Sequence, residues 1–151
     1  MKDPSDNIRD WLYGVLNGTV SYGGSYIPVY SYAPKDAEMP YIIIAEQMMN
    51  GEQGTKDAYI TEHEVTIEIW TSFTGNDASY IPANNIGDQV LQIVRQRKLE
   101  DQGSGGEAVA GITGFNVIRL LVNNLITDRF LIETGTVIYK SINIRLLLEE
   151  S

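Results

Sequence analysis

The chain has 151 residues, 43% of them hydrophobic, and we expect one domain, residues 1–151, that buries a core without disulfides or a structural metal. It has no cysteine, which excludes disulfide frameworks, thiolate metal sites and cysteine nucleophiles. The formal net charge is −9, so the electrostatic field of the protein repels phosphate and argues against tight non-specific binding of nucleic acid.

The acidic charge is compatible with a role in solubility, which we favour. It is also compatible with a channel lining that DNA passes without binding. The apolar runs are far shorter than the roughly 20 residues of a membrane-spanning helix, and the N-terminus lacks the layout of a signal peptide. We therefore expect a soluble, unprocessed protein with no membrane partner.

The first predicted element is an amphipathic helix that starts at the capping sequence Pro4-Ser5-Asp6 and ends at Asn17-Gly18. Between these signals the apolar residues recur three or four positions apart, at Ile8, Trp11, Leu12, Val15 and Leu16. This is the spacing of one buried helix face, so Trp11 is expected in the core.

Two strand patterns and a connection follow the helix. Residues 27–32 alternate around Pro28, which predicts a short strand at a sheet edge. Residues 40–45 are a β-branched run that predicts a central strand buried on both faces. Residues 48–58 show neither period and contain Asn50-Gly51, so we expect a long mobile connection there.

Residues 61–72 alternate polar and apolar side chains with a period of two, which predicts a strand with one buried face. The apolar face carries Val65, Ile67 and Ile69, and the polar face carries Glu64, Thr66, Glu68 and Trp70. Trp70 either closes the edge of the core, which we favour, or anchors an interface.

A strand with one apolar face needs a covering layer, and the next segment has helical spacing. Its apolar face carries Ile86, Val90, Leu91 and Val94. We expect this helix to begin near Asp77 or Ser79, or to have Pro82 in its first turn, and to end near Lys98.

Residues 112–126 and 136–148 are predicted to pair as an antiparallel hairpin whose turn lies within residues 127–135. Three apolar residues fall inside this turn: Phe130, Leu131 and Ile132. They either pack down on the core, which we favour, or meet another chain. The predicted fold class is α+β, with a mostly antiparallel sheet of four to five strands and helices packed on one face.

No residues converge on a catalytic or metal site. His63 is the only histidine, and in a regular strand it points away from Glu62 and Glu64, so these three side chains cannot bind one metal. Glu64 and Glu68 share a face but lie about 13 Å apart on an extended strand, too far for a catalytic carboxylate pair. The glycine-rich residues 103–106 lack the following Lys and Ser or Thr of a phosphate loop. We expect no catalytic residue, cofactor or metal.

The order of these elements resembles that of the tail-completion and tail-terminator proteins of tailed bacteriophages. The resemblance spans residues 5–98, and residues 100–151 match in kind only. It rests on the opening helix with Trp11 and Leu12, the glycine-rich bend before Val29-Tyr30, the strand Pro40-Tyr41-Ile42-Ile43-Ile44, the strand end Ile69-Trp70-Thr71 and the helix Ile86 to Val94. The long connection 48–58 and Pro82 depart from the pattern.

The resemblance implies a virion structural protein without enzymatic activity, which forms a ring at the head–tail junction or the tail end and joins or closes the tail. Its implied partners are further copies of the chain, neighbouring neck, portal or tail-tube proteins, and DNA that passes through the lumen without specific binding. The implied location is the virion, assembled in the bacterial host cytoplasm.

The two loops, 48–58 and 100–110, become candidate docking arms, with the alternative that they are ordinary surface loops. The candidate interface residues are Met48, Met49, Gln53, Lys56, Trp70, Gln102, Glu107 and Phe130. Two other functions stay open: a small hydrolase whose carboxylate pair comes from different segments, and a monomeric module that binds a peptide at a sheet edge.

Overall fold

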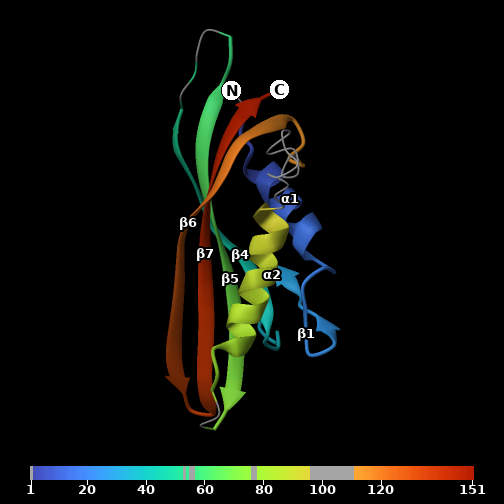
Figure 1. Ribbon diagram of the computed structural model, residues 1–151, viewed down its shortest axis with the longest axis vertical. Coiled ribbons are helices and arrows are strands. Elements are labelled where there is room, and N and C mark those ends of the chain that lie inside the picture. The colour runs from blue at the N-terminus through green and yellow to red at the C-terminus, as the bar shows by residue number, and fades with distance from the viewer. Residues whose placement is uncertain (1, 53, 55–56, 76–77, 96–110) are drawn as a thin grey trace.

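Two helices, α1 (Ser5–Leu16) and α2 (Ile81–Arg95), pack on one face of a twisted five-stranded sheet (Figure 1). This computed structural model describes residues 2–52, 54, 57–75, 78–95 and 111–151. The sheet has the order β3-β4-β5-β7-β6 and consists of β3 (Val29–Tyr30), β4 (Tyr41–Glu52), β5 (Ile60–Thr74), β6 (Phe115–Ile132) and β7 (Gly135–Glu150). A separate small hairpin consists of β1 (Ser21–Tyr22) and β2 (Ser25–Tyr26).

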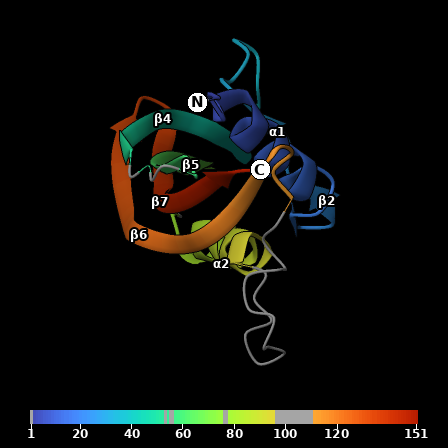
Figure 2. The ribbon, with the colours of Figure 1, turned by 90° about the horizontal axis from the view of Figure 1, so that it is seen from above.

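All strand pairs in the large sheet are antiparallel except β3 with β4, which is parallel. The α+β class, the mostly antiparallel sheet and the helices on one face are therefore as predicted. Seen along the strands, the sheet is strongly curved, and β4 and β6 arch around opposite sides of β5 and β7 (Figure 2). Within the described residues, no helix is long and apolar enough to cross a membrane.

The sheet has a helix-covered face and an open face, and side chains alternate between the two faces along each strand. The buried residues of β5 lie on the helix-covered face: Thr61, His63, Val65, Ile67, Ile69 and Thr71. The half-buried residues between them lie on the open face: Glu62, Glu64, Thr66, Glu68 and Trp70. The predicted alternation over residues 61–72 is confirmed, since the apolar side is the one that the helices cover.

Helix α1 begins and ends as predicted, with Asn17 donating its backbone N–H to the carbonyl of Tyr13. Its N-cap residue is Pro4, and Asp3 Oδ1 accepts hydrogen bonds from Ser5 N at 2.9 Å and Ser5 Oγ at 2.6 Å in the first turn. The helix therefore starts within the predicted capping sequence, and the side chain that binds its first turn is that of Asp3, directly before it.

Arg9 of α1 forms hydrogen bonds to a bulge in β4, where the register of pairing with β5 shifts between Ile44 and Gln47. Its guanidinium donates to the carbonyl of Ala45 at 2.8 Å, to Gln47 Oε1 at 3.3 Å and to the carbonyl of Ile44. Gln47 Nε2 in turn donates to the carbonyl of Ser5 at 3.0 Å. These bonds satisfy carbonyls that the bulge withdraws from the strand ladder.

The strand predicted at residues 40–45 is longer than expected and has one buried face, not two. Ile42 and Ile44 are buried, whereas Tyr41 and Ile43 are half-buried on the open face, which no helix covers. β4 continues to Glu52, so residues 48–52 of the connection predicted at 48–58 are strand, because pairing with β5 supplies partners for its backbone. The strand predicted at 27–32 is reduced to Val29–Tyr30.

Helix α2 begins at Ile81, later than Asp77 or Ser79, and Pro82 lies in its first turn, which was the other predicted position. Ser79 Oγ accepts the backbone N–H of Ile81 at 3.1 Å. The described part of α2 ends at Arg95, so the predicted end near Lys98 and the loop predicted at 100–110 lie outside the described residues.

The antiparallel hairpin of β6 and β7 is confirmed, and its turn, residues 133–134, lies within the predicted residues 127–135. β6 runs to Ile132 and β7 starts at Gly135, so the apolar residues of the predicted turn continue the ladder. Phe130, Leu131 and Ile132 are 41%, 81% and 48% exposed. The favoured prediction that they pack down on the core is wrong, because Phe130 and Ile132 lie on the open face, which no helix covers, and β6 is the margin of the sheet.

Candidate assembly surface

The most unusual surface of the molecule is β6, an edge strand that carries large apolar side chains into solvent. Between Leu121 and Ile132, every residue except the half-buried Val122 is exposed. The exposed large apolar residues of β6 are Ile118, Leu121, Leu125, Ile126, Phe130, Leu131 and Ile132. Soluble proteins protect their sheet edges with charge, proline, bulges or short strands, and a long apolar edge is typical of a surface that takes part in an interaction.

The exposed apolar side chains of β6 lie on both faces of the sheet. Leu121 and Ile126 oppose Arg145 and Ser141 on the open face, whereas Leu125 opposes Ile142 on the helix-covered face. A strand with solvent on one face alternates apolar with polar residues, and a strand that is apolar on both faces is typical of a buried position. The composition of β6 therefore fits a strand that is covered in an assembly.

An aromatic row crosses the open face, with one ring from each strand of the large sheet: Tyr30, Tyr41, Trp70, Tyr139 and Phe130. The rings of Trp70 and Tyr139 stack with centroids 4.8 Å apart, and Phe130 stacks on Tyr139 at 5.6 Å. Tyr30 meets Tyr41 edge to face at 5.9 Å. Burial raises the pKa of the Tyr41 hydroxyl, and the negative charge of Glu68 adds to this shift.

Trp70 therefore lies on the open face, away from both helices, and the favoured prediction that it closes the core under the next helix is wrong. Its indole Nε1 donates to Glu68 Oε1 at 3.1 Å, which satisfies the polar atom of the ring. The alternation along β5 places Trp70 on the polar face. Its aromatic partners on that face come from the neighbouring strands β6 and β7, which the local sequence around Trp70 does not reveal.

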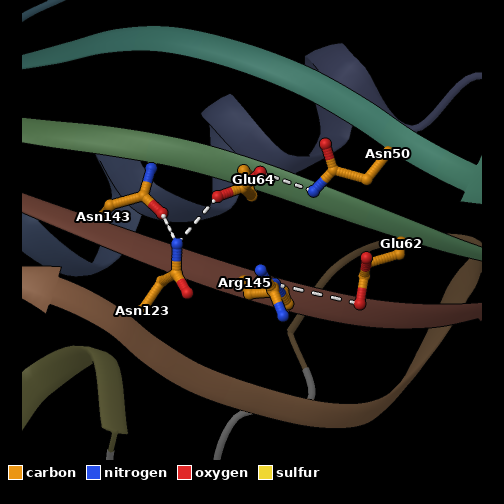
Figure 3. A network of polar contacts seen from close by, with 6 residues as sticks. All are labelled: Asn50, Glu62, Glu64, Asn123, Asn143 and Arg145. Atoms are coloured by element: carbon orange, nitrogen blue, oxygen red, sulfur yellow. Dashed lines mark hydrogen bonds and ion pairs between the residues drawn. The ribbon is translucent and has the colours of Figure 1, made fainter.

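A polar network on the open face ties four strands together (Figure 3). The Glu64 carboxylate of β5 accepts hydrogen bonds from Asn50 Nδ2 of β4 at 2.5 Å and from Asn123 Nδ2 of β6 at 3.0 Å. Asn123 Nδ2 also donates to Asn143 Oδ1 of β7 at 3.0 Å, and Asn143 Nδ2 donates to Thr66 Oγ1 at 3.0 Å. Asn123 sits where the β6 ladder shifts register, so this network fixes the bulge of β6 in place.

The same network bears on the hydrolase alternative. Glu46 and Glu64 line one shallow hollow of about 300 Å³. Both oxygens of Glu64 are engaged by amide donors, which is an arrangement that holds a carboxylate in place rather than one that moves a proton. Among the described residues, no group of three His, Asp or Glu side chains is placed to hold a metal ion.

The single histidine has a structural environment. His63 is 2% exposed on the helix-covered face, opposite to Glu62 and Glu64 as predicted, and its Nε2 lies 2.7 Å from Thr61 Oγ1. Burial lowers the pKa of His63 from its ordinary value, and the charge of Asp3 opposes this shift.

The predicted interface residues separate into two groups on the structure. Met48 and Met49 are 56% and 48% exposed near the end of β4, while Trp70 and Phe130 belong to the aromatic row. Gln53, Lys56, Gln102 and Glu107 lie outside the described residues. The exposed residues of β6 before Phe130 were missed, although apolar residues at both odd and even positions of the sequence 117–126 were a visible signal.

Comparison with known proteins gives a fold and no family. No protein family and no curated protein sequence matches the chain. A solved structure described as "Virion of native gene transfer agent (GTA) particle" contains a chain that superposes with a TM-score of 0.56 at 13% sequence identity. The match covers 97% of this chain and 91% of that chain. At this identity the likeness shows a shared fold.

Proposed function

We propose that the chain, as one domain, is a structural protein of a virion without enzymatic activity. The observation that carries this proposal is the long apolar edge of β6, which is exposed in the single chain and has the composition of a covered strand. The shared fold with a chain of a gene transfer agent particle supports a place in a phage-like particle.

Within that role, we propose a ring at the head–tail junction or the tail end that joins or closes the tail. A ring grows from one heterologous contact, for which each copy must offer two different surfaces. Two such surfaces lie towards opposite margins of the sheet: the end of the β6–β7 hairpin with Phe130 and Leu131, and the end of β4 with Met48 and Met49. Contacts with neighbouring neck, portal or tail-tube proteins use the remaining exposed surface.

The open face supports a further part of this proposal. Glu62, Glu64 and Glu68 lie on this face, in a chain with a net charge of −9. A lumen lined by carboxylates repels the DNA backbone, so DNA would pass through it without specific binding.

The test is the presence and oligomeric state of the protein in particles. We expect the protein to co-purify with particles made in the bacterial host and to form rings there in negative-stain images. The variant Leu131→Asp places a charge on a residue that is 81% exposed and should abolish ring formation while the chain stays folded. Ile81→Asp is the matched control, since Ile81 is 70% exposed at the start of α2, where Asp suits the helix dipole. A protein that never enters particles, or rings unaffected by Leu131→Asp, would contradict the proposal.

The free edge of β6 also fits the second candidate, a monomeric module that binds a peptide by strand addition. That function predicts a protein that stays monomeric in every preparation. It also predicts that the backbone amides on the free edge of β6 become protected from exchange only when a peptide is added. Hydrogen exchange of β6 with and without particle proteins separates the two functions.

A further inference from the structure

The middle of β6 is self-complementary when two copies lie antiparallel along their free edges. β6 contains a bulge between Val122 and Asn124, which changes the face that successive side chains occupy. The ladder with β7 places Arg119, Leu121, Asn124, Ile126 and Asp128 on the open face, and Leu120, Val122, Leu125 and Thr127 on the helix-covered face.

Two antiparallel strands related by a two-fold axis pair correctly only if opposite residues lie on the same face of the joint sheet. In a regular strand, a register centred between Asn123 and Asn124 fails this condition, because it pairs odd positions with even ones. The bulge removes the conflict, and every pair then matches in face. The pairs are Arg119 with Asp128 of the second copy, Leu120 with Thr127, Leu121 with Ile126, and Val122 with Leu125.

We propose that the free protein forms a two-fold dimer through this register of β6. Each Arg119 meets an Asp128, so the dimer has an ion pair at both ends of the ladder, and apolar pairs lie between them. Leu121, Leu125 and Ile126, which are 37%, 47% and 53% exposed in the single chain, become covered. A second register shift lies between Val117 and Arg119 and again changes the face that successive side chains occupy. Pairs beyond Arg119 would no longer match in face, so the ladder between the two copies ends there.

The ion pairs belong to the dimer and not to the single chain. Within one chain, Arg119 opposes Leu147 and Asp128 opposes Tyr139, at well-separated positions of the β6–β7 ladder. Among the residues that the structure describes, Arg119 and Asp128 have no ion-pair partner in the single chain, and each gains one when a second β6 lies antiparallel to the first. The network around Asn123 holds the bulge on which the matched faces depend.

One other register pairs apolar residues, and it is centred on Asp128. It would place Leu125 opposite Leu131 and Ile126 opposite Phe130, but it also places the two Asp128 carboxylates opposite each other on the axis. Like charges directly opposite destabilise a strand pair, whereas the proposed register pairs opposite charges twice.

Charge reversal tests the register in the purified full-length chain by sedimentation. Each of Arg119→Asp and Asp128→Arg replaces two attractive pairs by two repulsive ones, and each should raise the dimer Kd by about 10-fold or more. The double variant R119D/D128R restores both pairs with the signs exchanged and should recover the dimer. Lys35→Asp carries the same charge change as Arg119→Asp on an exposed loop residue and should leave the Kd unchanged.

Cysteine cross-linking gives a second readout, and the chain has no native cysteine to interfere. Leu121→Cys opposes Ile126→Cys only across the proposed dimer, at the Cα separation of a strand pair, which suits a disulfide. Oxidation of the two single variants mixed together should give the covalent dimer in high yield, and each variant oxidised alone should not.

A protein that is monomeric at all concentrations would overturn the inference. A dimer that is unaffected by Arg119→Asp, or that the double charge reversal does not restore, would overturn the register. The proposed dimer concerns the free protein and does not rest on the virion role. If no dimer forms but the protein is found in particles, the dimer is refuted and the proposed function is not.

Discussion

The bond set of Arg9 makes a sharp prediction, because one side chain from α1 serves three acceptors at the bulge of β4. Two of them are the backbone carbonyls of Ile44 and Ala45, and the third is Gln47 Oε1. Hydrogen bonds to a charged donor are worth about 1.5–3 kcal/mol each when buried, and for the half-buried Arg9 we take about 1 kcal/mol for each of the three bonds. Arg9→Met keeps the packing of the stem and removes all three bonds.

We expect Arg9→Met to lower the free energy of unfolding by about 3 kcal/mol, which corresponds to a Tm lower by about 6–12 °C for a chain of this length. Urea unfolding followed by tryptophan fluorescence measures the first value and calorimetry measures the second. Arg9→Lys keeps the charge but loses the fork of the guanidinium, so it should recover less than half of the loss. Hydrogen exchange should show faster opening of β4 from Ile44 to Met49, where one of the proposed ring surfaces begins.

The reasoning would be refuted if Arg9→Met unfolded within about 0.5 kcal/mol of the parent protein, since changes of that size are ordinary for exposed positions. It would also be refuted if Arg9→Lys were as stable as the parent, because charge alone would then account for the effect.

Three further predictions follow from other parts of the fold. His63 has a lowered pKa in the folded state, so the unfolded state takes up a proton first as the pH falls through about 6.5. The stability that is present above this pH is then lost as the pH falls further toward the lowered pKa of the folded state. Urea unfolding between pH 8 and 5 should show this fall in the free energy of unfolding, and His63→Gln should reduce its dependence on pH. Gly135→Ala should cost at least about 2 kcal/mol, because φ is +156° and a Cβ would lie 1.8 Å from the carbonyl oxygen of Phe73, whereas Gly14→Ala, with open space on α1, should stabilise the chain by about 0.5–1 kcal/mol in the same thermal melt. Trp70→Leu removes two ring contacts and should cost about 1–3 kcal/mol in the purified protein, and an unchanged Tm would mean that the aromatic row does not hold the strands together.

Local patterns were sufficient for those elements whose two sides differ strongly in polarity. α1 was predicted to its ends because helical spacing and the Asn17-Gly18 stop signal agree, and the faces of β5 followed from strict alternation. The position of His63 away from its acidic neighbours followed from the same alternation. These features depend on neighbours in sequence, so the sequence by itself determined them.

Pairing between distant segments decided the rest. β4 extends to Glu52 and β6 extends to Ile132 because β5 and β7 offer backbone partners there, which outweigh the turn residues and the weak local pattern. The aromatic row requires one side chain from each of five strands at matching levels, and no segment alone contains that information. The same holds for the edge position of β6: exposed apolar residues become an assembly surface only because the order of strands leaves β6 at the margin of the sheet.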